Sequence, residues 1–270
     1  MRRFLENKLE NLKAYLKKLK KVAIAFSSGV DSTFLLKVAH DELKENVIAL
    51  SIKADSFPER EINQAVEFCK NENIKHIVVE FDELKIEGFK SNPPNRCYLC
   101  KKALFQKMKE IAKQNNIEYI LEGSNLDDES DYRPGMQAVF ELGIKSPLKE
   151  LRFSKNEIRI LSRKLGLKTA DKPSYACLAS RFTYGEEITK EKLHMVDSAE
   201  QFLLDLGFYQ VRVRLHDNIA RIEVIPDEFE KILKNKKQIT DKLKLFGFKY
   251  ITLDLTGYRS GSMNEILDKK

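Results

Sequence analysis

The residues best suited to phosphate chemistry are Ser27-Ser28-Gly29-Val30-Asp31-Ser32, which join a short apolar run to an amphipathic segment. The apolar run, 22–26, predicts a buried strand, and the amphipathic segment predicts a helix that ends near residue 44. Backbone N–H groups at the start of that helix, together with the helix dipole, favour an anion at the loop. Gly29 lets a phosphate approach the backbone, and the serine hydroxyls add hydrogen-bond donors. The loop lacks the Gly-Lys-Ser/Thr ending of a Walker A motif, so we expect another class of phosphate-binding loop.

The carboxylate of Asp31 repels a phosphate, so we expect it to hold Mg²⁺ or to orient the loop. A simpler alternative is a serine-rich turn in which Asp31 or Ser32 caps the helix. The position of the loop, between a buried strand and a helix, favours phosphate binding.

The chain has 270 residues and contains Cys69, Cys97, Cys100 and Cys177, which do not form a disulfide framework in an intracellular protein of this size. Cys97 and Cys100 form a Cys-x₂-Cys pair at the start of a predicted helix, and Cys177 lies in a predicted loop. Three cysteines in one pocket could hold a 4Fe-4S cluster with one open iron. Alternatively, Cys177 alone could attack a substrate and give up its sulfur, or all of these thiols could be inert and buried.

Charged neighbours bear on these alternatives. Lys172 and Arg181 flank Cys177 in the sequence and would favour its thiolate. Cys69 lies on a helical stripe, so we expect it to serve packing alone.

The elements that must position these residues alternate between strand and helix in the first half of the chain. Apolar runs that predict buried strands lie at 22–26, 47–52, 76–80 and 119–122. Segments that predict helices lie at about 3–20, 33–44, 59–71 and 100–115, with further helices near 131–142 and 155–165. This alternation predicts an α/β fold, a doubly wound parallel sheet with helices on both faces.

The pattern changes near residue 189. A helix over 189–206 precedes a hairpin at 211–225, a helical segment at 227–246 and a strand at 250–254. We therefore predict a phosphate-loop domain over 1–188 and a small α+β domain over 189–270.

One face of the predicted hairpin carries Arg212 and Arg214, because side chains two residues apart share a strand face. Two arginines at this spacing can clamp a phosphate; the alternative is an ordinary solvated strand face. Glu200 and Glu223 are candidate Mg²⁺ ligands near that phosphate, or simple surface charges.

The segment from Ala25 to Phe34 resembles the PP-loop of the ATP-pyrophosphatase superfamily, whose usual loop is Ser-Gly-Gly-x-Asp-Ser. This resemblance implies that a substrate oxygen attacks the α-phosphate of ATP while pyrophosphate stays on the loop. Ser28 stands where the first glycine is usual, which bears on whether position 28 needs a glycine-only conformation.

Almost the whole chain also resembles the LarE family, ATP-dependent sulfur transferases of nickel-pincer cofactor biosynthesis. The segments that carry the resemblance include 122–128, 131–135, 172–181, 184–189, 211–214 and 255–265. It implies that a carboxylate of pyridinium-3,5-biscarboxylic acid mononucleotide is adenylated and then converted to a thiocarboxylate. It also suggests a trimer-based oligomer.

In some members of that family the cysteine matching Cys177 supplies the sulfur and becomes dehydroalanine. Members that also carry the Cys-x₂-Cys pair are expected to use a cluster, so we expect Cys97, Cys100 and Cys177 to hold 4Fe-4S.

The remaining site residues are assigned with this substrate in view. Asp127 and Asp128 follow a predicted parallel strand, at the end where α/β sites gather, and are metal or substrate-orienting candidates. We expect Ser124 and Asn125 to contact the nucleotide. Arg133 and Arg181, with Ser180 beside the latter, are expected at the adenylate.

Three other functions fit parts of the sequence: a tRNA thiolase with a three-cysteine cluster, an ATP-dependent amide synthetase, and an iron–sulfur or nucleotide sensor. The net charge of +7 suits an anionic partner, but no RNA-binding motif is present and we expect no nucleic-acid partner. No apolar stretch is long enough to span a bilayer, and the basic N-terminal segment lacks the features of a signal peptide. We therefore expect a cytoplasmic protein without a membrane partner.

Overall fold

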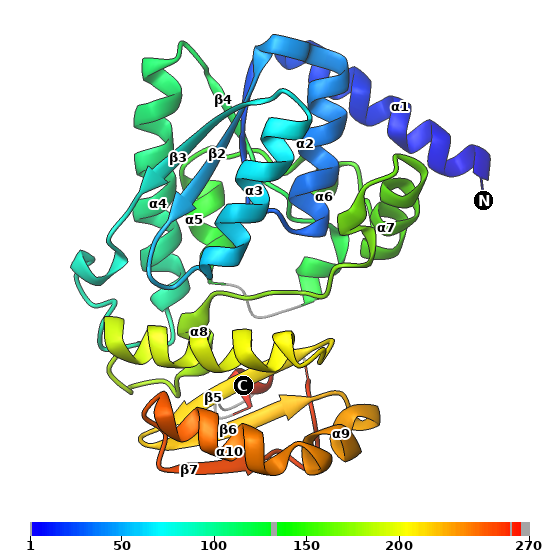
Figure 1. Ribbon diagram of the computed structural model, residues 1–270. Coiled ribbons are helices and arrows are strands. Elements are labelled where there is room, and N and C mark those ends of the chain that lie inside the picture. The colour runs from blue at the N-terminus through cyan, green and yellow to red at the C-terminus, as the bar shows by residue number, and fades with distance from the viewer. Residues whose placement is uncertain (1, 131–133, 260, 266–270) are drawn as a thin grey trace. The chain divides into compact units, whose positions relative to one another are not determined.

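The computed structural model describes residues 2–130, 134–259 and 261–265 (Figure 1). Contacts between residues divide the chain into two compact units. Unit 1 comprises 1–82 and 97–175, and unit 2 comprises 83–96 and 176–270. This division differs from the predicted boundary between residues 188 and 189, because 83–96 and 176–188 group with the C-terminal residues.

Unit 1 is built on a parallel sheet with the strand order β3-β2-β1-β4. Its strands are β1 (Val22–Ala25), β2 (Val47–Lys53), β3 (Lys75–Glu80) and β4 (Tyr119–Leu121). Val22 pairs in parallel register with Val47 on one side and with Tyr119 on the other. Each strand falls on an apolar run of the sequence, so the predicted parallel sheet is confirmed.

Helices cover both faces of this sheet (Figure 1). They are α1 (Arg2–Leu19), α2 (Val30–Leu43), α3 (Glu59–Asn71), α4 (Arg96–Gln114), α5 (Gly135–Glu141), α6 (Pro147–Glu150) and α7 (Lys155–Lys164). Val22 and Ile24 of β1 pack in a core with apolar residues of α1, α2, α3 and α7. Ala23, between them, packs in the other core, with residues of α4 and α5. Successive side chains of a strand point to opposite faces, so these two cores establish the doubly wound arrangement.

Two helices of unit 1 begin at different residues from those predicted. Helix α4 begins at Arg96 rather than near Cys100, which places the whole Cys-x₂-Cys pair in its first turn. Helix α5 begins at Gly135. Residues 131–133, where the sequence predicts its start, lie outside the described residues.

Unit 2 contains α8 (Lys190–Asp205), α9 (Phe229–Lys234), α10 (Lys236–Leu245) and the strands β5 (Val211–His216), β6 (Ile219–Val224) and β7 (Tyr250–Leu253). The strand order is β5-β6-β7, with β5 antiparallel to β6 and β7 parallel to β6. The helical segment predicted at 227–246 is interrupted at Asn235. The Nδ2 group of Asn235 donates to the Lys231 carbonyl at 2.8 Å, a local bond that competes with helix continuation.

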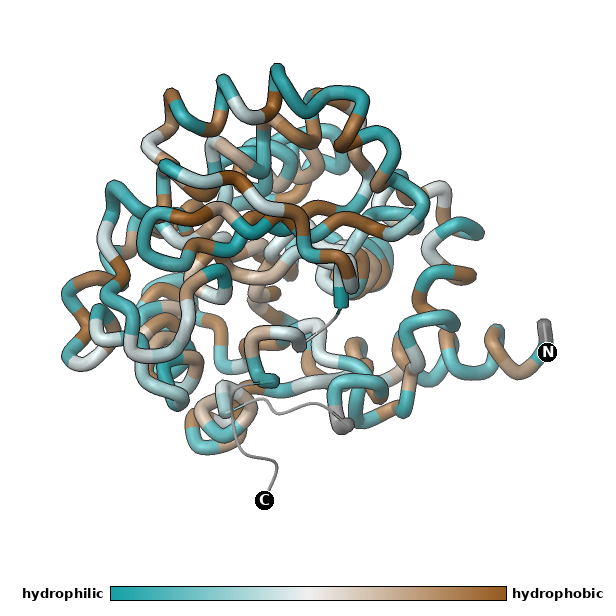
Figure 2. The backbone as a smooth tube through the Cα atoms, turned by 90° about the horizontal axis from the view of Figure 1, so that it is seen from below, coloured by the Kyte–Doolittle hydropathy of each residue, from teal (hydrophilic) through white to brown (hydrophobic). Residues whose placement is uncertain are grey.

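Hydrophobic and hydrophilic residues alternate along many elements, as amphipathic helices and strands require (Figure 2). The hairpin shows that alternation does not reveal burial. Much of its charged face is buried as well, with Arg212 3% exposed and Glu223 fully buried. No helix among the described residues has both the length and the apolar character that a membrane span requires.

Candidate active site

The phosphate loop lies where strand β1 leads into helix α2. Gly29 is the N-cap of α2, and the first backbone bond of the helix runs from the Thr33 N–H to the Gly29 carbonyl at 3.0 Å. The N–H groups of the preceding residues therefore lie outside the bonding ladder of the helix. The Ser27 and Ser32 hydroxyls lie 3.0 Å apart and form a hydrogen bond between the first and last residues of the loop. Backbone N–H groups at a helix start favour an anion, and phosphate binding at this loop stays a prediction.

Ser28 has a φ of 53°, in the left-handed region that favours glycine. Gly29 lies outside this region, since its φ is −74°. The Ser28 hydroxyl donates to the Glu61 backbone carbonyl at 2.9 Å and to the Glu61 carboxylate at 3.1 Å. Bonds to α3 therefore stabilise a conformation that is unfavourable for residues with a side chain.

We expect Ser28→Gly to retain ATP–pyrophosphate exchange, because glycine adopts this backbone conformation without strain. Ser28→Val should lose most of it, since a β-branched residue at positive φ adds about 1–2 kcal/mol of strain and removes the hydroxyl. Exchange rates of both variants check this. Equal activity of the two would show that the conformation of residue 28 is unimportant.

Asp31 lies in the first turn of α2, and its carboxylate is largely buried. Its Oδ2 atom pairs with Lys155 Nζ of α7, while its buried Oδ1 atom has no hydrogen-bond partner among the residues that the structure describes. Burial raises the pKa of Asp31 above its ordinary value, against the lowering influence of Lys155, and the charge of Asp128 adds to the rise. A buried carboxylate oxygen without a donor, beside a phosphate loop, is a suitable ligand for Mg²⁺.

Lys155 was not predicted as a site residue. It is the first residue of α7, where the capping box of Ser154 and Glu157 fixes the start of the helix. Its backbone N–H also donates to Asp127 Oδ2 at 2.9 Å. The sequence could have shown that a lysine follows a capping serine at a helix start. Its pairing with Asp31, 124 residues away, follows only from the fold.

The segment after β4 lies against the phosphate loop. A Cβ atom at Gly123 would lie 3.0 Å from the Ser32 nitrogen, a tight contact that a larger residue could make only if the loop backbone shifted. Asn125 accepts from the Asp127 N–H at 2.9 Å, and Asp128 Oδ2 accepts from the Asn125 N–H at 2.9 Å. The structure thus brings Asn125, Asp127 and Asp128 to the sheet edge that carries Asp31.

Ser124 has a structural role in this segment. Its hydroxyl donates to the buried Glu122 carboxylate at 2.7 Å, and Ser146 donates to the other oxygen of the same group. Arg133, predicted at the adenylate, lies outside the described residues.

Lys172 lies in unit 1 and serves the phosphate loop. Its ammonium group donates to the Ser28 carbonyl at 3.0 Å and to Glu61 at 2.7 Å, with 11% of the side chain exposed. The expectation that Lys172 favours a Cys177 thiolate stays a prediction, since Lys172 belongs to unit 1 and Cys177 to unit 2. The charge of Lys172 is held by Glu61 and by the loop backbone.

The predicted cluster ligands are divided between the units. Cys97 and Cys100 belong to unit 1, the first exposed and the second buried, whereas the half-buried Cys177 belongs to unit 2. Among the described residues, no three His, Cys, Asp or Glu side chains gather in a way that could hold a metal ion. Cys69 packs in the core of unit 1, as expected, and burial raises the pKa of its thiol to about 12.

Unit 2 contains a buried charged centre beneath the hairpin. Arg181 forms a two-point pair with Glu200, at 2.7 and 2.9 Å, and Arg214 forms one with Glu223, at 2.9 and 3.0 Å. Burial opposes the charge of Arg181, but Glu200 outweighs it and raises the pKa of that guanidinium. Ser180 accepts two hydrogen bonds at 2.7 Å: its hydroxyl oxygen accepts from Arg181, and its backbone carbonyl accepts from Arg214.

Glu200 and Glu223, the candidate Mg²⁺ ligands, therefore face arginines. Glu200 also accepts the Val213 N–H at 2.9 Å. Each carboxylate is thus engaged by an arginine side chain, Glu200 by Arg181 and Glu223 by Arg214.

Arg212 lies on the same strand as Arg214 and is 3% exposed. It donates to the Val211 carbonyl at 2.7 Å, and its guanidinium lies over the Tyr258 ring. Burial and the charge of Arg181 lower the pKa of Arg212 to about 10, although Glu200 and Tyr258 oppose this shift. A buried cation whose charge is disfavoured by its surroundings is suited to receive an anion.

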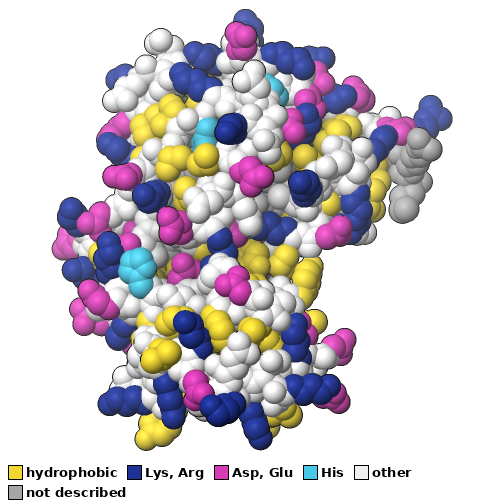
Figure 3. Space-filling model, in the orientation of Figure 1, with side chains coloured by type: hydrophobic (Ala, Val, Ile, Leu, Met, Phe, Trp, Pro, Cys, Tyr) yellow, Lys and Arg dark blue, Asp and Glu magenta, His cyan; other side chains and the backbone are white. Residues whose placement is uncertain are grey.

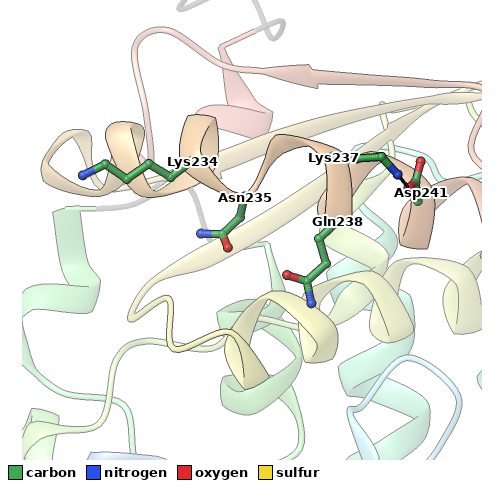
Figure 4. Close-up of a pocket in the computed structure, with 5 residues that line it drawn as sticks. All are labelled: Lys234, Asn235, Lys237, Gln238 and Asp241. Carbon is green, nitrogen blue, oxygen red and sulfur yellow. Dashed lines mark hydrogen bonds and ion pairs between the residues drawn. The ribbon is translucent and has the colours of Figure 1, made fainter.

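A surface cavity of about 320 Å³ lies on α9 and α10 (Figure 4). Its lining consists of Lys234, Asn235, Lys237, Gln238 and Asp241, with Lys237 bonded to Asp241 at 2.9 Å. None of the predicted site residues lines it, so we do not assign the chemistry to this cavity.

The surface charge is mixed. On the face shown in Figure 3, Lys and Arg side chains are interspersed with Asp and Glu. The net charge of +7 is therefore not gathered in one basic patch on this face.

Known proteins resemble this chain over its full length. A PP-loop domain model matches residues 1–133. The pyridinium-3,5-bisthiocarboxylic acid mononucleotide synthase of Lactiplantibacillus plantarum is 38% identical over 266 residues, which cover 98% of this chain and 96% of that protein. Uncharacterized proteins of Synechocystis and of Methanocaldococcus jannaschii are 43% and 34% identical, over 98% and 94% of this chain and 100% and 98% of their own lengths. The three full-length matches include both the phosphate loop and the arginine-rich hairpin, whereas the PP-loop domain model includes the loop alone.

Proposed function

We propose the reaction of this protein from one premise: the chain belongs to the LarE family of PP-loop, ATP-dependent sulfur transferases. The protein uses ATP, forming AMP and pyrophosphate, to activate a carboxylate for sulfur transfer. We propose that its substrate is pyridinium-3,5-biscarboxylic acid mononucleotide and that its product is the bisthiocarboxylic acid. The observation that carries the ATP half is the phosphate loop at the start of α2 with the buried Asp31 beside it.

Adenylation uses residues of unit 1. A substrate carboxylate oxygen attacks the α-phosphorus of ATP, the bond to the bridging oxygen breaks, and pyrophosphate leaves on the loop. The N–H groups at the start of α2 and Lys155 would stabilise the departing charge. Asp31, with Asp128 nearby, would hold Mg²⁺, which neutralises phosphate oxygens when it is bound.

Substrate binding would use the charged centre of unit 2. The substrate carries one phosphate, and Arg212 is a buried cation whose pKa is lowered to about 10 by burial and by the charge of Arg181. Arg214 lies on the same strand face, held by Glu223. Together they would hold the phosphate through two guanidinium groups.

Sulfur transfer would depend on Cys177. Sulfur attacks the adenylated carbon, and AMP leaves as the thiocarboxylate forms. If Cys177 supplies this sulfur itself, its Cβ–Sγ bond breaks with loss of the Cα proton, leaving dehydroalanine. A 4Fe-4S cluster on Cys97, Cys100 and Cys177, which we favour, would instead carry an extra sulfide; the three thiolates are donors of the right chemistry.

The choice between these sulfur sources is tested by anaerobic purification with iron and sulfide analysis, followed by mass spectrometry after turnover. We expect about four irons per chain, as a 4Fe-4S cluster requires, and an intact Cys177. A protein without iron whose Cys177 appears as dehydroalanine would refute the cluster. Absence of ATP–pyrophosphate exchange with this substrate would refute the proposed reaction.

A cytoplasmic location and a trimer-based assembly complete the proposal. The family resemblance supports both.

The acid side of the pH profile tests the Asp31–Lys155 pair. Asp31 must be ionised to hold Mg²⁺, and Lys155 lowers its pKa. Lys155→Met removes that influence, so the pKa of Asp31 rises and the acid limb of ATP–pyrophosphate exchange moves to higher pH. Lys155→Arg should keep the limb near its original position. If the acid limb of Lys155→Met stays where it is in the wild-type protein, ionisation of Asp31 does not set that limb.

A further inference from the structure

Buried side chains hold the backbone of the turn that presents Cys177. The 3-10 turn Leu178–Arg181 follows this cysteine directly, and the Ser180 N–H donates to the Cys177 carbonyl at 2.9 Å. Arg181 Nη1 donates to the Cys177 carbonyl at 3.3 Å and to the Ala176 carbonyl at 3.1 Å. Arg214 holds the Ser180 carbonyl. These arginines already belong to the proposed substrate centre.

Another arginine, Arg96, reaches the same turn from a distant part of the sequence. Its side chain is 2% exposed, and Nη1 donates to the Ala179 carbonyl at 2.8 Å and to the side-chain oxygen of Asn92. Asn92, itself fully buried, donates to the Thr183 carbonyl at 2.7 Å and to the Phe182 carbonyl at 3.4 Å. All of these residues lie in unit 2.

The burial of Arg96 indicates a geometric role. Desolvating a guanidinium costs several kcal/mol, and an apolar side chain of similar volume would fill the space without that cost. What the guanidinium adds is a rigid, planar set of donors that fixes its acceptors in direction as well as distance. Here the acceptors are the Ala179 carbonyl, two residues after Cys177, and Asn92, which holds the chain further on.

We propose that Arg96 is a positioning residue for sulfur transfer. By holding the Ala179 carbonyl it fixes the turn that presents Cys177, so that the sulfur carried there meets the activated carboxylate in one geometry. Arg96 is also the first residue of α4 and directly precedes Cys97 in the chain. This inference rests on the proposed role of Cys177 and assigns Arg96 no part in adenylation.

The test uses the full-length variants Arg96→Gln and Arg96→Lys, with Ile239→Ala as control. Ile239 is 1% exposed in α10 of the same unit, so its truncation lowers stability without touching the turn. Hydrogen exchange of the peptide 176–183 reports on the turn without requiring activity. ATP–pyrophosphate exchange with the pyridinium substrate reports on adenylation, and single-turnover thiocarboxylate formation reports on sulfur transfer.

We expect Arg96→Gln to accelerate amide exchange in 176–183 and to slow sulfur transfer by roughly 100-fold, the scale of a misplaced reacting group. ATP–pyrophosphate exchange should stay at the wild-type level. Arg96→Lys, which keeps the charge and one donor, should recover part of both effects. Ile239→Ala should lower the melting temperature and leave the ratio of the two activities unchanged.

Unchanged exchange in 176–183 would overturn the proposal, as would a parallel loss of adenylation and sulfur transfer. If Arg96→Gln does not fold, Arg96→Lys is judged by the same criteria. A wild-type protein inactive in ATP–pyrophosphate exchange would instead contradict the proposed function, and the hydrogen-exchange comparison would still decide whether Arg96 holds the turn.

Discussion

Replacing Cys177 with serine is expected to abolish thiocarboxylate formation and to leave ATP–pyrophosphate exchange near the wild-type level. Cys177 belongs to unit 2, whereas the phosphate loop, Asp31 and Lys155 belong to unit 1, so the two half-reactions depend on different residues. Serine preserves the size of the side chain but supplies neither a transferable sulfur nor a thiolate ligand. Product analysis by mass spectrometry and the exchange assay, run on the same preparation, measure the two halves separately.

Two other cysteine variants complete this experiment. Cys69→Ala is the matched control, because Cys69 is buried in the unit 1 core and burial raises the pKa of its thiol to about 12. Cys97→Ser distinguishes the sulfur sources, since it should remove the iron and the activity of a cluster enzyme. Full activity of Cys97→Ser, with dehydroalanine at position 177, would show that Cys177 is the donor. Thiocarboxylate formation by Cys177→Ser would contradict both models.

Mutations of Arg212 and Arg214 are expected to have different effects on the stability of unit 2. Arg214→Gln leaves Glu223 buried without its main partner, which should destabilise unit 2 by about 3–5 kcal/mol. Arg212→Gln removes a cation whose pKa is already lowered to about 10 by burial and by Arg181. Its loss should leave the melting temperature unchanged or raise it. Both variants should weaken binding of the substrate, Arg212→Gln by roughly 10–100-fold, the value of one charge-assisted contact to phosphate.

Thermal unfolding and titration of the pyridinium mononucleotide measure these effects. Adding the substrate should stabilise the wild-type protein more than it stabilises Arg212→Gln. The same substrate without its phosphate is the matched ligand control and should bind both proteins equally. A strongly destabilised Arg212→Gln would show that Arg212 serves the fold, and would remove the electrostatic basis for a phosphate site.

Local sequence patterns predicted the parts of this protein that are built locally. The phosphate loop needs only a strand, a turn and a helix in succession, and all three are visible between Val22 and Leu43. Ser28 stands where the usual loop has glycine, and this difference raised the question of a left-handed conformation at position 28. Its stabilisation by Glu61 was not visible, because α3 meets the loop only through the fold.

The site features that the sequence did not predict depend on contacts between residues far apart in the chain. Alternation placed Arg212 and Arg214 on one face of a strand but could not show that this face is covered. Glu200 of α8 and Ser262 near the C-terminus bond to Arg181 and to Arg214, and this centre is buried. Lys155 and Arg96 were missed for the same reason, since their partners lie 124 and 83 residues away.

The discontinuity of unit 2 also sets an order of events during synthesis. The segment 83–96 leaves the ribosome well before the residues it packs with, since Arg96 precedes its acceptor Ala179 by 83 residues. At about 5–20 residues per second this interval is roughly 4–17 s. During it, Asn92 and Arg96 stay hydrated while β4, the last strand of the parallel sheet, is synthesised. The nascent chain should therefore acquire its nucleotide-binding half first, and the cysteine-bearing turn only once the last third has emerged.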